Sequence, residues 1–172
     1  MPVIIIFLGF LFFVGICFLS AYLFDSAFGG LDFVSNRAAR VVAVNIIKQR
    51  NLASGIFYDL GSARGKLAAG LAKDLPELNI IGIDNSRLRT LVAKSRSKFL
   101  KNLHFRKENL FQTNVSAADI VYVYLPQELM PDLEVKLQKE LKPGSIVITN
   151  RVSFPSWKET EKNQQLFIYA KE

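Results

Sequence analysis

The sequence predicts an α/β protein with a Rossmann-like, mostly parallel sheet, helices on both faces, a short C-terminal β-hairpin and one preceding transmembrane helix. Two observations lead to this prediction. From residue 55 onward, short and nearly continuous apolar runs alternate with segments of helical periodicity, which is typical of a parallel sheet covered on both faces. Residues 3–24 form a run of 22 positions without a charged side chain, which is long enough to cross a membrane as a helix.

The charged residues are distributed very unevenly along the chain. All 22 Lys and Arg residues lie within residues 37–172, and only Asp25 and Asp32 precede them among the 15 acidic residues. The single cysteine, Cys17, excludes an intrachain disulfide, and with only one histidine, His104, we expect no metal site.

The apolar run of residues 3–24 is interpreted as an uncleaved membrane anchor. A cleaved signal peptide is the alternative, with a weak small-residue site at 19–21, but the run lacks a basic leading segment and is longer than usual. Four basic residues follow the run at positions 37, 40, 48 and 50. By the positive-inside rule, we expect a single-pass membrane protein with its C-terminal domain in the cytoplasm.

Three regions are predicted: an anchor over 1–25, a linker with a leading amphipathic helix over 26–54, and the main domain over 55–172. The linker, placed at 25–33, contains the Gly29-Gly30 break. Ser35 is expected to cap the leading helix, placed at about 35–49, which would pack against the domain.

The elements of the main domain follow from apolar runs and the turn residues between them. Strands are expected at 56–60, 79–84, 103–107, 119–125 and 145–151, with a final strand pair between residues 157 and 170. Helices are expected over about 65–74, from 85 or 86 to about 100, and over about 127–141. For the second of these helices, the periodicity predicts an apolar face comprising Leu88, Leu91, Val92 and Phe99.

Basic residues are concentrated in residues 87–107, which contain eight Lys and Arg residues. The simplest interpretation is a solvated helix face opposite the apolar positions. The alternatives are contact with anionic lipid headgroups, or contact with nucleic acid, for which the sequence contains no recognition motif.

The residues expected to carry chemistry follow the strands, at the edge where parallel sheets bind ligands. Asp59 precedes the small-residue loop 61–65, Asp84 ends the second strand, and the segment Glu108-Asn109-Leu110-Phe111 follows the third. The glycine spacing does not match G-x-G-x-x-G, and a carboxylate at position 59 would repel a pyrophosphate. It would suit an ammonium or sulfonium group, which favours S-adenosylmethionine over NAD as the cofactor.

The motifs DLGSARG (59–65), GID (82–84), ENLF (108–111) and LKPG (141–144) resemble those of class I, seven-strand S-adenosylmethionine-dependent methyltransferases. The resemblance covers about 35–172. More narrowly, residues 32–42, the segment YLPQELMPDLEVKLQKELKPG (124–144) and the end from 157 to 169 resemble the small archaeal and mitochondrial protein-lysine methyltransferases. The departures are Ala63, where the family usually has glycine, Arg64, where it has an acid, and Asn109, where it has Asp.

The resemblance implies roles for residues at the strand ends. Asp59 and the loop would hold the methionine part of the cofactor, Asp84 the ribose hydroxyls, and Asn109 with the Leu110 amide the adenine. The implied cofactor-binding residues are Asp59, Gly61, Ser62, Ala63, Gly65, Asp84, Asn85, Asn109 and Leu110. Residues 124–126 would line the opening to the methyl acceptor, and Tyr124 and Glu128 are the candidate catalytic residues because either could assist deprotonation of an amine.

The expected function is therefore that of a membrane-anchored methyltransferase that N-methylates a protein lysine or another amine. Its expected partners are the methyl acceptor and the membrane, reached through residues 3–24 and through anionic lipid headgroups. Two alternatives stay open. One is a methyltransferase-like scaffold module at the membrane that has lost catalysis, which would account for Ala63 and Arg64. The other is an NAD-type Rossmann oxidoreductase, which Asp59 and the glycine spacing disfavour.

Overall fold

The computed structural model describes residues 2–28 and 37–172, with side chains described at 4–23 and 37–172. The chain divides into two compact units, an N-terminal helix and a C-terminal domain. The linker residues 29–33 and the predicted cap Ser35 lie outside the described residues.

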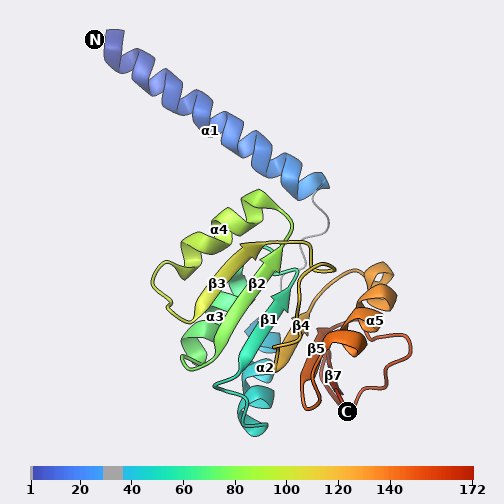
Figure 1. The fold of residues 1–172 in the computed structure, drawn as a ribbon. Coiled ribbons are helices and arrows are strands. Elements are labelled where there is room, and N and C mark those ends of the chain that lie inside the picture. Colours follow the sequence, from blue (N-terminus) through green and yellow to red (C-terminus); the bar gives the residue numbers. More distant parts are fainter. Residues whose placement is uncertain (1, 29–36) are drawn as a thin grey trace. The chain divides into compact units, whose positions relative to one another are not determined.

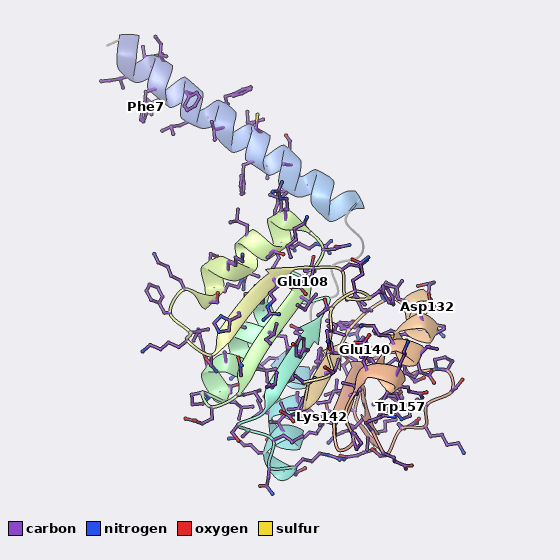
Figure 2. All side chains as sticks on the ribbon, viewed as in Figure 1. Phe7, Glu108, Asp132, Glu140, Lys142 and Trp157 are labelled. Carbon is purple, nitrogen blue, oxygen red and sulfur yellow. The ribbon has the colours of Figure 1, made fainter. Side chains whose placement is uncertain are left out.

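The N-terminal unit is one long helix, α1 (Pro2–Phe28). Its segment Ile4–Leu23 has a mean hydropathy of 2.8, and by length and composition it could cross a membrane. Large apolar side chains are exposed all along this segment, including the labelled Phe7 (Figure 2). The helix includes residues 25–28, which were predicted to begin the linker, because no helix-breaking residue occurs before Gly29-Gly30.

The C-terminal domain is built on a seven-stranded sheet of order β3-β2-β1-β4-β5-β7-β6, which confirms the predicted fold class (Figure 1). The five parallel strands are β1 (Ile56–Leu60), β2 (Asn79–Asp84), β3 (Leu103–Lys107), β4 (Ile120–Val123) and β5 (Ile146–Asn150). The antiparallel pair β6 (Glu161–Asn163) and β7 (Leu166–Ala170) forms the predicted C-terminal hairpin. The strand order reverses between β1 and β4, where ligands bind in sheets of this kind.

Helices cover the two faces unequally. On one face, α2 (Arg37–Gln49), α3 (Lys66–Asp74) and α4 (Arg87–Ser97) contribute to one apolar core, and α2 and α3 are seen behind the strands in Figure 1. On the other face, the second core contains residues of a single described helix, α5 (Met130–Glu140), which follows the 3₁₀ turn η1 (Gln127–Leu129). The loop between β3 and β4 completes that core with Val115 and Ala118.

The burial of α4 differs from the prediction. Leu91 is 57% exposed and Phe99, beyond the helix end at Ser97, is 88% exposed, whereas Arg89 and Ala93 are buried. The small Ala93 lies against the backbone of Gly65, so α4 packs closely on the β1–α3 loop through its least bulky side. The predicted apolar face was therefore wrong, because close packing of this helix on the loop requires a small residue rather than Leu or Phe.

The amino-terminal edge of the sheet is held by Asp119. Its carboxylate accepts a hydrogen bond from the Ile56 N–H at 2.7 Å and forms an ion pair with Lys142 Nζ, also labelled in Figure 2, at 2.6 Å. Partial burial opposes ionisation of Asp119, but the hydrogen bonds from Lys142 and Ile56 outweigh it and lower its pKa. Asp119 thereby joins the start of β1 to the chain preceding β4 and β5.

We expect Asp119→Asn to lower the free energy of unfolding by about 1–2 kcal/mol at pH 7, because a charge-assisted hydrogen bond is lost. A lowered pKa stabilises the fold above the unfolded-state value and stops doing so as the pH falls through the folded-state value. The difference from wild type should therefore vanish in acid. Chemical unfolding at pH 7 and pH 3 checks this, with the exposed α5 residue Asp132→Asn as the control. Equal destabilisation at both pH values would contradict it.

Candidate cofactor and acceptor site

Asp84, at the carboxyl end of β2, organises the candidate site. Its carboxylate accepts hydrogen bonds from the Ala63 N–H at 2.9 Å and from the Ser86 N–H at 2.8 Å. Its backbone carbonyl accepts one from Glu108 N–H at 3.1 Å. One buried residue thus joins the β1–α3 loop, the start of α4 and the segment after β3, which brings together three of the four predicted site segments.

The N–H groups of the β1–α3 loop are already used inside the protein. Those of Gly61 and Ser62 both donate to the Ile83 carbonyl, at 2.9 and 2.8 Å, and that of Gly65 donates to the Ser62 carbonyl at 2.8 Å. With Ala63 bound to Asp84, four of the five loop residues have no backbone donor left for a ligand. A pyrophosphate needs a cluster of unused N–H donors, so this geometry argues against the NAD-type alternative.

The two glycines of the loop are required by the fold itself. Gly61 has φ +81° and a Cβ there would lie 2.6 Å from Leu125 Cδ2, while at Gly65, with φ +70°, a Cβ would overlap the Phe105 ring. Ala63 also has a left-handed conformation, with φ 48°, and is buried. The loop therefore accommodates alanine at a backbone conformation that favours glycine.

Asp59 lies at the end of β1, next to Asp84, and only 4% of it is exposed. Burial, together with the nearby negative charge of Asp84, raises the pKa of Asp59 to about 7. A buried carboxyl with a raised pKa is stabilised in its ionised form by a neighbouring cation. The donor set therefore fits a ligand bearing an ammonium and a sulfonium group, as S-adenosylmethionine does.

The remaining predicted cofactor residues lie at the rim. Asn109 is exposed, and its Oδ1 accepts the Phe111 N–H at 3.0 Å in a tight turn, which leaves the side-chain amide available as a donor. Leu110 packs partly on the second apolar core, and Phe111 is partly exposed. Asn85 is exposed next to Asp84.

On the acceptor side, Tyr124 follows β4 and is partly buried, and its ring lies 5.9 Å from the Arg151 guanidinium. Glu128 is exposed on η1, so the structure does not hold its carboxylate against the other site residues.

Two residues that sequence reasoning missed lie beside Tyr124. Asn150 ends β5, and its side-chain amide donates to the Tyr122 hydroxyl at 2.8 Å. Arg151 follows with φ 65°, beyond the strand rather than within it. Their position after a strand adjacent to β4 was the available signal, because parallel neighbours end at the same edge.

The seven-strand order, the antiparallel hairpin and the acidic strand ends define a class I S-adenosylmethionine-dependent methyltransferase. An RNA methyltransferase from Salinibacter ruber, solved with S-adenosyl-L-homocysteine, has the same fold, with a TM-score of 0.70, 19% identity, and coverage of 81% of this chain and 92% of that one. A methyltransferase from Geobacter sulfurreducens, also in complex with S-adenosyl-L-homocysteine, has a TM-score of 0.59 at 20% identity, covering 75% of this chain and 54% of that one.

The family model described as the ANTKMT methyltransferase domain matches residues 59–161, and the chain belongs to this family.

Two relatives are similar in sequence over much of this chain. A protein-lysine N-methyltransferase from Saccharolobus islandicus is 29% identical over 109 residues, which cover 62% of this chain and 68% of that protein. A lysine N-methyltransferase of an ATP synthase component from Xenopus laevis is 30% identical over 118 residues, 66% of this chain and 50% of that protein. The match therefore spans about half the length of the amphibian relative.

We expect Asp59→Asn to stabilise the free protein and weaken cofactor binding. Asparagine resembles the protonated carboxyl, so its advantage is absent near pH 4, grows as the pH rises and levels off above pH 7, at up to about 4 kcal/mol. Denaturant unfolding of the full chain in detergent at pH 4, 6 and 8 measures the stability.

Calorimetric titration with S-adenosylmethionine measures the binding. The wild type should bind more tightly at pH 8 than at pH 6, because the cationic ligand favours ionised Asp59, and it should release protons on binding. Unchanged affinity in Asp59→Asn, or a loss of stability at pH 8, would contradict the assignment.

We expect Ala63→Gly to raise the free energy of unfolding by about 0.5–1 kcal/mol, because glycine adopts a positive φ without strain. The exposed turn residue Gln164, with φ 53°, is a matched control: Gln164→Gly should stabilise to a similar extent without altering cofactor affinity. A destabilised Ala63→Gly would mean that the Ala63 methyl group has a packing role.

Proposed function

We propose that this chain is a membrane-anchored protein-lysine N-methyltransferase whose catalytic domain lies on the cytoplasmic side of the membrane. The observation that carries the chemical part is the buried Asp59 beside Asp84, under a loop whose N–H groups are already bonded. The lysine acceptor is supported by family membership and by relatives named as lysine N-methyltransferases in an archaeon and an amphibian.

In this proposal the chain binds the cofactor by charge and shape. Asp59 pairs with the cationic methionine part, the loop from Gly61 through Ser62 and Ala63 to Gly65 encloses it, and Asp84 accepts the ribose hydroxyls. Asn85, Asn109 and Leu110 surround the adenine. Bound S-adenosylmethionine supplies a methyl group that is activated by its sulfonium charge.

The chain's contribution to the reaction is alignment more than acid–base catalysis. Direct displacement at a methyl group gains most from holding the acceptor nitrogen in line and excluding water. Tyr124 lies beside Leu125, which packs over Gly61, and the stacked Arg151 limits movement of its ring. We propose that Tyr124 positions the acceptor amine. Glu128, which is exposed on η1, can accept a proton only after the acceptor has bound.

The membrane part of the proposal is supported by α1. It presents 20 consecutive positions of high mean hydropathy without a charged side chain and with exposed apolar side chains. The basic residues that follow α1 support the cytoplasmic orientation. Within this proposal, residues 1–25 are the anchor, 26–54 the linker and leading helix, and 55–172 the methyltransferase domain.

The scaffold alternative depends on Ala63 and Arg64 disrupting the loop. In the structure Ala63 takes the required left-handed conformation, and its N–H reaches Asp84. The loop is therefore intact with alanine at this position, which favours an active enzyme over a scaffold that has lost catalysis.

The test is methyl transfer by the full chain. We expect the chain in liposomes, incubated with radiolabelled S-adenosylmethionine and membranes of the source cell, to label a protein band, and mass spectrometry to place the methyl group on lysine. Tyr124→Ala should lower kcat roughly ten- to hundredfold with little change in cofactor affinity, and Tyr124→Phe should lose less.

Asp59→Asn serves as the cofactor-binding control and Asp132→Asn as the surface control. Label that appears on lipid or RNA, or only on a non-lysine side chain, would contradict the acceptor assignment. Cofactor binding without any transfer would instead favour the scaffold module.

A further inference from the structure

The most basic surface of the domain coincides with its most exposed apolar side chains. Eight of the chain's 22 Lys and Arg residues lie in residues 85–107, which contain no Asp or Glu; the other 14 are matched by the 15 acidic residues. Leu91 and Phe99 in the same segment are 57% and 88% exposed. The excess positive charge of the chain is therefore local, and it surrounds apolar groups.

These groups share one face of α4. Arg87, Leu91, Lys94 and Lys98 follow one another at spacings of four, three and four residues, which places them in a single stripe on a helix. All four are exposed, and Phe99 follows the last of them, with the Lys98 ammonium 5.6 Å from its ring centroid. We call these five residues, Arg87, Leu91, Lys94, Lys98 and Phe99, the α4 stripe.

Folding alone does not account for the α4 stripe. Lys94 and Lys98 are like charges four residues apart, which destabilises a helix, and the face of α4 that packs on the domain is formed by Arg89, Thr90 and Ala93 instead. Both the cations and the two apolar side chains are presented to a surrounding phase rather than to the core.

We propose that the α4 stripe docks the domain on an anionic lipid surface, with Leu91 and Phe99 inserted among the headgroups and the cations at the phosphates. Helices with basic and large apolar side chains bind interfaces in this way. This inference deepens the membrane part of the proposed function. A second copy of the chain fits poorly because two such stripes repel, and nucleic acid would use the cations but not Leu91.

Docking through α4 has a consequence for the site. The residue that caps α4, Ser86, donates its N–H to Asp84, and its side chain accepts from the Arg89 N–H. The candidate cofactor residues thus lie at the amino-terminal end of the docking helix. A domain held by α4 presents its strand ends next to the lipid surface, where a lysine close to a membrane would be the accessible acceptor.

The test uses the full chain with Cys17→Ala and a fluorescent NBD label on Ser95→Cys, an exposed position beside the α4 stripe. The chain is reconstituted in vesicles of phosphatidylcholine alone or with 30% phosphatidylglycerol. Docking should shift the emission to the blue and allow quenching by brominated lipid in the anionic vesicles only, and 0.5 M salt should reverse it.

Two variants remove the two halves of the α4 stripe separately. Lys94→Gln with Lys98→Gln should lower the ratio of docked to undocked protein roughly thirtyfold, from the usual lipid contribution of each Lys. Leu91→Ser with Phe99→Ser should abolish lipid quenching. The matched control on α5, Val135→Ser with Lys139→Gln, removes another exposed apolar residue and a basic one and should change nothing.

Equal emission in both kinds of vesicle, or no effect of either stripe variant, would overturn the proposal. So would loss of binding to a short RNA in the charge variant with lipid docking intact, or a shift that depends on protein concentration. Flotation with neutral vesicles in high salt reports anchoring by α1 separately. A chain that fails to float there but docks on anionic vesicles disproves the anchor and supports the α4 stripe.

Discussion

The site depends on one buried carboxylate that is bonded to three segments of the chain. Asp84 binds the N–H groups of Ala63 and Ser86 through its side chain and that of Glu108 through its backbone. A buried N–H without a partner is costly, so these bonds fix the loop after β1, the start of α4 and the segment after β3 relative to one another. The shape of the cofactor cleft therefore follows from the end of a single strand.

The same arrangement places two carboxyl groups side by side out of water. Asp59 and Asp84 end adjacent strands, and the pKa of Asp59 rises to about 7 because it is buried beside another acid. The free fold is weakened by this pair, and a cationic ligand relieves it. Stability of the free protein and affinity for the cofactor are in this way opposed at one residue, as is common at binding sites.

Outside the site, the domain has unequal faces. One face of the sheet carries three helices and the other carries α5 with loops. The helix at the β3 edge, α4, packs through Ala93 and leaves Leu91 and three cations exposed. A domain of this size with two complete cores does not need α4 to bury those side chains, which leaves its outer face available for another surface.

Most strands, the small-residue loop and its acidic neighbours could be predicted from the sequence, because apolar runs and glycine turns are local signals. Asp59, Asp84 and the segment at 108–111 were identified for the same reason: each directly follows a strand, and parallel strands end together. The sequence could not indicate that Gly65 faces Phe105 rather than a ligand, nor that Arg151 stacks on Tyr124, since both contacts join distant segments.

The amino-acid sequence by itself determined an apolar N-terminal segment, an alternating α/β domain and a cofactor of positive charge. Only the tertiary structure decided which residues face inward on α4. Helical periodicity shows which side chains share a face, but the face that is buried depends on how closely the helix approaches the loop beneath it. Here Ala93 against Gly65 permits the close approach, so the larger Leu91 and Phe99 are turned outward among the basic residues.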